Sequence, residues 1–83
     1  MSETEAVQEH VLDVREIPPQ NRHPIIFGLF DGLEVGSSIQ LIADHNPRPL
    51  RYLFEAEFGS KCSWTYLEQG PDVWRVRLER QAD

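Results

Sequence analysis

The chain has 83 residues, 40% of them hydrophobic, which predicts one small folded domain and not a disordered protein. The formal net charge is −6, which disfavours nucleic acid and anionic membrane surfaces as partners, because phosphate groups bind to basic patches. A single cysteine excludes an internal disulfide and a CxxC motif, and no apolar run approaches the ~18–20 residues of a membrane span. The N-terminus has no basic, apolar signal sequence, so the expected location is the cytoplasm.

Two apolar runs with strand character divide the first half of the chain. Residues 1–9 are polar and acidic, so we expect a disordered N-terminal tail and then a single domain at 10–81. The first strand is predicted at 10–14 and the second at 38–43, where Ile and Leu predominate. A proline-rich turn and a segment with helical spacing follow each strand, which is typical of strand–helix–strand units.

The segment between these two strands predicts an amphipathic helix. His23 precedes a proline and is biased away from helical dihedral angles, so we expect it to be the N-cap with Pro24 at the first helical position. The helix should end near Leu33, and Gly28 should either weaken it or permit close packing on the sheet. The positions expected to face the core are Ile26, Phe27, Phe30 and Leu33.

The second half of the chain predicts another helix and a hairpin. The helix should occupy 47–58 or 49–58, and strands are expected at 62–68 and 73–80 around a short turn. Its buried stripe should consist of Leu50, Leu53 and Phe54. Strand–helix–strand units cross over right-handed, so both helices should cover one face of a four-stranded sheet. The predicted fold class is α+β, a two-layer α/β sandwich with the order β-α-β-α-β-β and one open sheet face.

Both strand–helix junctions carry charged and imidazole side chains. If the first two strands are parallel, both helices begin at the same edge of the sheet, and their unpaired N–H groups favour anions there. Ligands of α/β sheets bind at such an edge. The predicted ligand or small-anion rim consists of Arg15, Glu16, His23, Asp44, His45 and Arg48.

Each rim residue also has a purely structural interpretation. His23 and His45 could share a metal ion with a carboxylate, or they could cap a helix and bond to loop backbone. Asp44 could act as a general base, or it could accept backbone N–H groups of its turn. The arginines, Arg22 among them, could bind an anion or pair with Glu16 and Asp44. No nucleophile–base–orienter set can be drawn, so we predict no catalytic residue and no particular cofactor.

The expected hairpin register assigns residues to two faces of the sheet. A four-residue turn places Tyr66 opposite Arg75 and Trp64 opposite Arg77, and we expect these four on the open face. Because Trp, Tyr and Arg are enriched at binding hot spots, the predicted partner surface is Trp64, Tyr66, Arg75 and Arg77. The alternative is that cation–π pairs simply cover an open sheet. The residues assigned to the core face are Thr65, Leu67, Trp74, Val76 and Leu78.

Four segments together resemble a bacterial and archaeal family called domain of unknown function 2249. They are LDVREIPP at 12–19, RHP at 22–24, DHNPRPLRY at 44–52 and GPDVWRV at 70–76. This family is similar in fold to the TusA/SirA sulfur-carrier proteins, which implies a mixed sheet in the order 1-2-4-3 with the last strand antiparallel. The family has no established activity, and its occurrence beside hemerythrin-like and other metal-linked domains implies redox or nitrogen-oxide physiology.

The sulfur carriers have a Cys-Pro pair at the start of the first helix, where this chain has His23 and Pro24. A histidine cannot carry a persulfide and Cys62 lies elsewhere, so a degenerate sulfur-transfer protein is the least favoured hypothesis. We expect a non-catalytic binding or accessory module that acts through protein–protein contact, as a monomer or weak dimer. The alternative is a metal- or small-anion-binding domain that uses His23 and His45.

Overall fold

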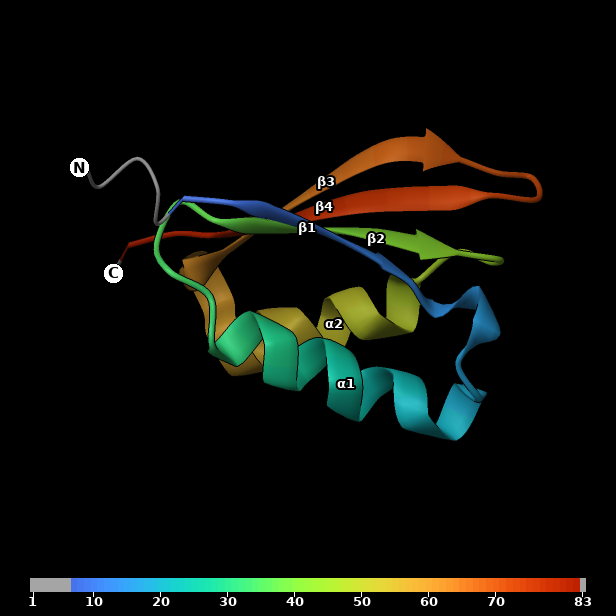
Figure 1. Ribbon diagram of the computed structural model, residues 1–83, viewed down its shortest axis with the longest axis horizontal. Coiled ribbons are helices and arrows are strands. Elements are labelled where there is room, and N and C mark those ends of the chain that lie inside the picture. Colours follow the sequence, from blue (N-terminus) through green and yellow to red (C-terminus); the bar gives the residue numbers. More distant parts are fainter. Residues whose placement is uncertain (1–6, 83) are drawn as a thin grey trace.

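The computed structural model describes residues 7–82, in which a four-stranded sheet and two helices form two layers (Figure 1). The elements in chain order are β1 (Glu9–Asp13), η2 (Val14–Glu16), α1 (Pro19–Asp31), β2 (Ser38–Ala43), α2 (Arg48–Phe58), η3 (Gly59–Lys61), β3 (Cys62–Gln69) and β4 (Trp74–Arg80). Both helices cover the same face of the sheet, so the predicted α+β sandwich is confirmed. Of the predicted tail at 1–9, residues 1–6 lie outside the described part of the chain, and Glu9 already belongs to β1.

The strand order is β1-β2-β4-β3, the order that the family resemblance implied. β1 runs parallel to β2, and β4 runs antiparallel to both of its neighbours. A parallel pair needs a crossover connection, which α1 supplies. The carboxyl ends of β1 and β2 therefore lie at the same end of the sheet, where the chain enters η2 and the loop at 44–47.

The core lies between the sheet and the two helices. Phe30 of α1 and Phe54 of α2 are fully buried, and their ring centroids lie 5.1 Å apart in an edge-to-face arrangement. Phe27 and Phe58 stack beside them with centroids 5.8 Å apart. Such aromatic pairs each contribute roughly 0.5–1.5 kcal/mol beyond the area that they bury. The buried core residues are Val14, Ile26, Phe30, Ile39, Leu41, Ala43, Leu50, Phe54, Val76 and Leu78.

The start of α1 differs from the prediction. Pro19 occupies the first helical position, where its missing N–H would have had no partner, and Pro18 is the cap. His23 and Pro24 therefore lie inside the helix, and the predicted N-cap at His23 is wrong. α2 follows its prediction within one residue, but Leu53 is 45% exposed and does not belong to the buried stripe. Within residues 7–82, neither helix is long and apolar enough to span a membrane.

A β-bulge in β3 reverses the face assignment that we predicted for that strand. The extra residue is Leu67, which lies between Tyr66 and Glu68 and has no partner on β4. The observed pairs beyond the bulge are Trp64 with Leu78, Thr65 with Arg77, and Tyr66 with Val76. The predicted pairs, Trp64 with Arg77 and Tyr66 with Arg75, are therefore wrong. A shift of one residue is enough to move every side chain of a strand to the opposite face.

The bulge brings two aromatic side chains of β3 to the core side of the sheet. The ring centroids of Trp64 and Tyr66 lie 6.2 Å apart, and those of Tyr66 and Trp74 lie 6.3 Å apart. Burial of these large rings explains why the bulged register is favoured over the regular one. Thr65 is exposed and Leu67 is 41% exposed, so their assignment to the core is wrong. The β4 positions assigned to the core, Trp74, Val76 and Leu78, are confirmed.

Candidate functional site

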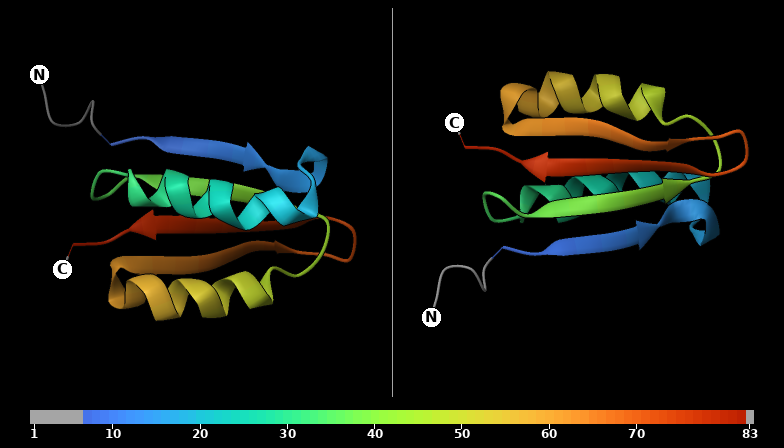
Figure 2. Two further views of the ribbon diagram at one scale, coloured as in Figure 1. Left: turned by 90° about the horizontal axis from the view of Figure 1, so that it is seen from below. Right: turned by 90° about the horizontal axis from the view of Figure 1, so that it is seen from above.

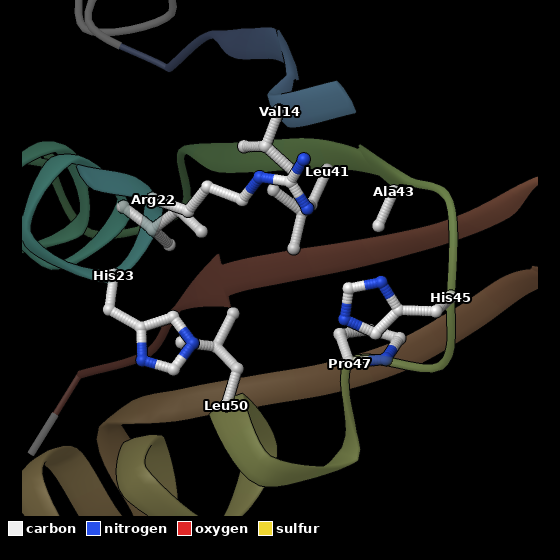
Figure 3. A pocket seen from close by; sticks show the side chains of 9 residues that line it. Val14, Arg22, His23, Leu41, Ala43, His45, Pro47 and Leu50 are labelled. Atoms are coloured by element: carbon white, nitrogen blue, oxygen red, sulfur yellow. The ribbon is translucent and has the colours of Figure 1, made fainter. Parts of the chain in front are cut away.

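A small hollow opens at the carboxyl ends of β1 and β2, beside the beginnings of both helices (Figure 3). Its volume is about 40 Å³. One water needs about 10–15 Å³ of such space, so the hollow has room for a few waters or one small ion. Its lining consists of Val14, Arg22, His23, Ile26, Leu41, Ala43, His45, Pro47 and Leu50.

Arg22 reaches this hollow from the first turn of α1. Its side chain is only 12% exposed, and Nε donates a 2.8 Å hydrogen bond to the carbonyl of Ile17. The terminal nitrogens make longer contacts, 3.4 Å from Nη2 to the Arg15 carbonyl and 3.5 Å from Nη1 to Oδ1 of Asp44. The guanidinium is thus held in place through Nε, and its terminal N–H groups have donor capacity left for another acceptor.

His45 and Asp44 form a hydrogen-bonded pair on another side of the hollow. Nδ1 of His45 lies 2.7 Å from Oδ1 of Asp44, which orients the ring and leaves Nε2 for a different partner. This hydrogen bond, together with the nearby charge of Arg22, lowers the pKa of Asp44 below its ordinary value. Asp44 itself does not line the hollow. Its carboxylate contacts Arg22 and His45 from outside the hollow and helps to orient both side chains.

His23 lines the hollow from α1, across from His45 (Figure 3). The side chain is exposed, and within residues 7–82 its ring has no hydrogen-bond partner. The two histidines that we singled out from the sequence therefore border one shared space. Figure 3 also shows the side chain of Leu50 between the two rings.

The remaining predicted rim residues lie outside the hollow. Arg15 pairs with Asp13, with 2.9 Å from Nε to Oδ1 and 2.7 Å from Nη2 to Oδ2. This ion pair lowers the pKa of Asp13 to about 2. Glu16 and Arg48 are exposed and line no part of the hollow. Of the six predicted rim residues, only His23 and His45 line the hollow itself.

Arg22 is the residue that our predicted rim lacked. From the sequence it was one of several arginines that could bind an anion or form an ion pair. Its place in the site depends on the start of α1 at Pro19. This start puts Arg22 in the first turn of the helix, where its side chain contacts Asp44 in the loop after β2. Arg22 belongs to the RHP segment that we singled out in the sequence. Its place in the site could be recognised only once the start of α1 at Pro19 was known.

A metal site in this hollow would need more ligands than the chain brings together. Zinc sites use three or four protein ligands. Among the described residues, no three His, Cys, Asp or Glu side chains gather in a way that could hold a metal ion. His23 and His45 therefore offer two imidazoles without a third protein ligand.

Cys62 is separated from this hollow and has the properties of an unreactive thiol. It begins β3 and lines a different hollow beside α2. Burial raises the pKa of the Cys62 thiol to about 11. Reactive cysteines have a lowered pKa, so this environment does not favour sulfur transfer.

The open face of the sheet carries a ladder of hydrogen-bonded polar side chains. Glu9 accepts hydrogen bonds from Arg77 at 3.0 and 3.2 Å and from Gln40 at 3.2 Å. Arg75 donates to Gln40 at 3.1 Å and to Glu68 at 3.0 Å. These five side chains come from all four strands, so the ladder crosses the whole sheet.

The four residues of the predicted partner surface do not share a face. Arg75 and Arg77 belong to the open-face ladder, whereas Trp64 and Tyr66 pack against the core under the helices. The aromatic–arginine surface that we predicted is therefore divided by the sheet. Its physical cause is the bulge, which turned the aromatic side chains of β3 inward.

A search of curated proteins and a search of solved structures each find no match for the chain. The likeness to the sulfur-carrier fold accordingly stays a prediction. A comparison with protein families gives a match over residues 11–80, which includes both helices, three complete strands and most of β1. The chain therefore belongs to the family described as Uncharacterized conserved protein (DUF2249).

Proposed function

We propose that the domain is a non-catalytic binding module that holds a small oxyanion in the hollow beside the two helices. One observation carries this proposal: within residues 7–82, the polar side chains that line the hollow are Arg22, His23 and His45, and none of them is a carboxylate. Arg22 and the ring of His23 can each direct an N–H group at an anion, whereas Nε2 of His45 donates only in the imidazolium form, because its Nδ1–H is directed at Asp44. A guanidinium matches the paired oxygens of phosphate, sulfate or carboxylate groups. The small volume limits the occupant to an ion of that size.

The beginning of α2 supports the same assignment. α2 has no side-chain cap and no acidic residue in its first turn. N–H groups of a first helical turn have no partner within the helix, and they favour negative charge nearby. Pro47 and Leu50 line the hollow, so the positive end of α2 borders it.

The hollow supplies no complete catalytic set. Asp44 and His45 have the geometry of a general base and its orienting group. Among the described residues, however, no Ser, Thr or Cys side chain lines the hollow, so this part of the chain supplies no nucleophile for the pair to activate. The lining residues therefore support binding without covalent chemistry.

A titration of the isotope-labelled protein with phosphate, sulfate and nitrite tests the proposal through the imidazole resonances of His23 and His45. We expect both rings to shift and to saturate. Arg22→Gln should weaken phosphate binding roughly 10-fold or more, because a hydrogen bond to a charged group contributes about 1.5–3 kcal/mol.

Arg15→Gln is the matched control, because it removes the same charge from an exposed arginine at the same end of the sheet. Its phosphate affinity should equal that of the wild type. Arg22→Gln also loses the bond to Ile17, so His23→Gln, an exposed substitution, provides a second variant with the same expected weakening. Shifts that never saturate, or equal losses in Arg15→Gln and Arg22→Gln, would overturn the proposal.

We further propose an accessory role beside a protein partner, with the cytoplasm as its location and redox or nitrogen-oxide metabolism as its setting. The family resemblance and the acidic composition support this part of the proposal. Nitrite that binds more tightly than sulfate would agree with the nitrogen-oxide setting. The metal-binding alternative would be favoured if zinc chloride caused saturable shifts of the His23 and His45 resonances while all three anions left these resonances unchanged.

A further inference from the structure

A groove runs along one outer edge of the sheet, between β3 and α2. β3 is an edge strand, because it pairs with β4 on one side only. Figure 2 shows α2 projecting past the unpaired edge of β3, and Figure 1 shows that α2 lies in the helix layer below the sheet. Two hollows of about 200 and 330 Å³ lie along this side, and Arg51 and Glu55 line both of them. We call these adjoining hollows the α2–β3 groove.

The groove borders the unpaired edge of β3. An edge strand has a row of N–H and C=O groups without partners in the sheet, which proteins either cover or use to bind an extended segment. The bulge at Leu67 interrupts the ladder, so the regular part of β3 is 62–66. Five extended residues span roughly 17 Å, enough to pair with a short strand of a partner.

The groove carries a positive charge that nothing in the described chain balances. Arg51 pairs with Glu55 at 3.3 Å, so these two charges offset each other. Arg48 also lines the groove, and within residues 7–82 it has no ion-pair partner. It is the first residue of α2, where the helix dipole makes a positive charge unfavourable. The chain as a whole carries a net charge of −6, so the complementarity to an acidic partner is local and comes from Arg48.

Tyrosine side chains border the same part of the groove. Tyr52 is 61% exposed although its ring is large, and Tyr66 lies half-buried on β3. Tyrosine and arginine are the side chains that most often dominate binding energy at protein interfaces. Arg48, Tyr52 and Tyr66 thus give the groove the composition of a contact surface.

We propose that the α2–β3 groove binds an acidic segment of a partner protein in extended conformation, which pairs with β3 as a fifth strand. Alternate side chains of an extended segment point to the same side, so acidic residues at every second position can face the side of the groove that carries Arg48. The groove and the oxyanion hollow have no lining residue in common. This proposal therefore goes beyond the oxyanion site and can fail independently of it.

The test uses the full chain and the peptide acetyl-Val-Glu-Val-Glu-Val-Glu-Val-amide, followed by amide resonances in a titration. We expect saturable shifts along β3 and the first half of α2, and no shifts in β1, the other edge of the sheet. Arg48→Gln should lower the affinity for the peptide several-fold, because a partly screened charge contact contributes roughly 1 kcal/mol. Arg15→Gln, which changes an exposed arginine away from the groove, should leave peptide binding unchanged.

The same peptide with Lys in place of Glu should not bind, because only backbone pairing without charge complementarity remains. Equal binding of both peptides, or shifts along β1 in place of β3, would overturn the proposal. So would β3 resonances that shift with protein concentration alone, because the groove would then be covered by a second copy of the chain. Absence of binding at millimolar peptide would count against it as well.

Discussion

The hydroxyl of Tyr66 donates a 3.0 Å hydrogen bond to the side-chain oxygen of Asn46. This bond ties the loop after β2 to the edge strand β3. Asn46 directly follows His45, which lines the oxyanion hollow, and both Asn46 and Tyr66 line the α2–β3 groove. One hydrogen bond thus supports the loop that the two proposed sites share.

Tyr66→Phe should lower the free energy of unfolding by about 1 kcal/mol, because a half-buried hydrogen bond is lost and Asn46 keeps an unpaired oxygen. Urea denaturation measures this change. The loop at 44–47 should also exchange its amide hydrogens faster, and phosphate should bind more weakly through His45. Tyr52→Phe is the control, since it removes an exposed hydroxyl and should change stability by less than about 0.5 kcal/mol. Equal stability of the two variants would show that the bond does not hold the loop.

Acid should unfold the domain through its paired carboxylates. The hydrogen bond from Arg77 lowers the pKa of Glu9, and the hydrogen bonds from Arg15 lower that of Asp13 to about 2. A carboxyl whose pKa is lower in the folded state contributes stability above its unfolded value and loses it as the pH falls through the folded value. We therefore expect the urea midpoint to stay level from about pH 7 to 5 and to fall between about pH 4.5 and 2.

Asp13→Asn isolates the part of this acid response that Asp13 contributes. The asparagine oxygen can still accept from the backbone N–H of Arg15, but it carries no charge to pair with the guanidinium. The variant should be less stable than the wild type at neutral pH, and the difference should shrink as the pH falls toward 2 and vanish only below the folded-state pKa. A difference that stays constant from neutral pH to pH 2 would contradict the assignment of the lowered pKa to this pair.

Replacement of two glycines by alanine should change the stability of the domain in opposite directions. Gly70 has a φ of +71°, and a Cβ there would lie 2.8 Å from the ring of Trp74, so Gly70→Ala should destabilise by about 1–3 kcal/mol. Gly28 lies within α1, and a Cβ there would have no atom within 4 Å. Gly28→Ala should therefore stabilise by roughly 0.5–1 kcal/mol, and the expectation that Gly28 permits close packing is wrong. Thermal unfolding of both variants checks the two signs, and destabilisation by Gly28→Ala would contradict the geometry.

The parts of the fold that could be predicted have strong local patterns. β2 was expected at its observed residues, because its Ile and Leu side chains form a continuous apolar run that a central strand requires. α2 was expected within one residue, because Leu50 and Phe54 recur at helical spacing on the side that meets the sheet. In both segments the local pattern and the tertiary environment favour the same structure.

The parts that could not be predicted depend on contacts between distant segments. Nothing near Leu67 in the sequence marks a bulge, and the register is decided by burial of Trp64 and Tyr66 beside α2. At the start of α1, both Pro19 and Pro24 satisfy the preference for proline in the first helical position, so the pattern alone could not choose between them. The first uncertainty explains why the predicted partner surface is divided between the two faces of the sheet. The second explains why Arg22 was missing from the predicted rim.

Cys62 gives a direct test of the sulfur-transfer alternative. Its pKa of about 11 exceeds the ordinary value of 9.0, so the folded protein has roughly 100-fold less thiolate than an unfolded chain at the same pH. The thiolate is the reacting form, and iodoacetamide should therefore alkylate native protein about 100-fold more slowly than urea-unfolded protein. Mass spectrometry of samples quenched over time measures both rates. A native rate equal to or above the unfolded rate would mean an activated thiol, and sulfur transfer through Cys62 would then become the better hypothesis.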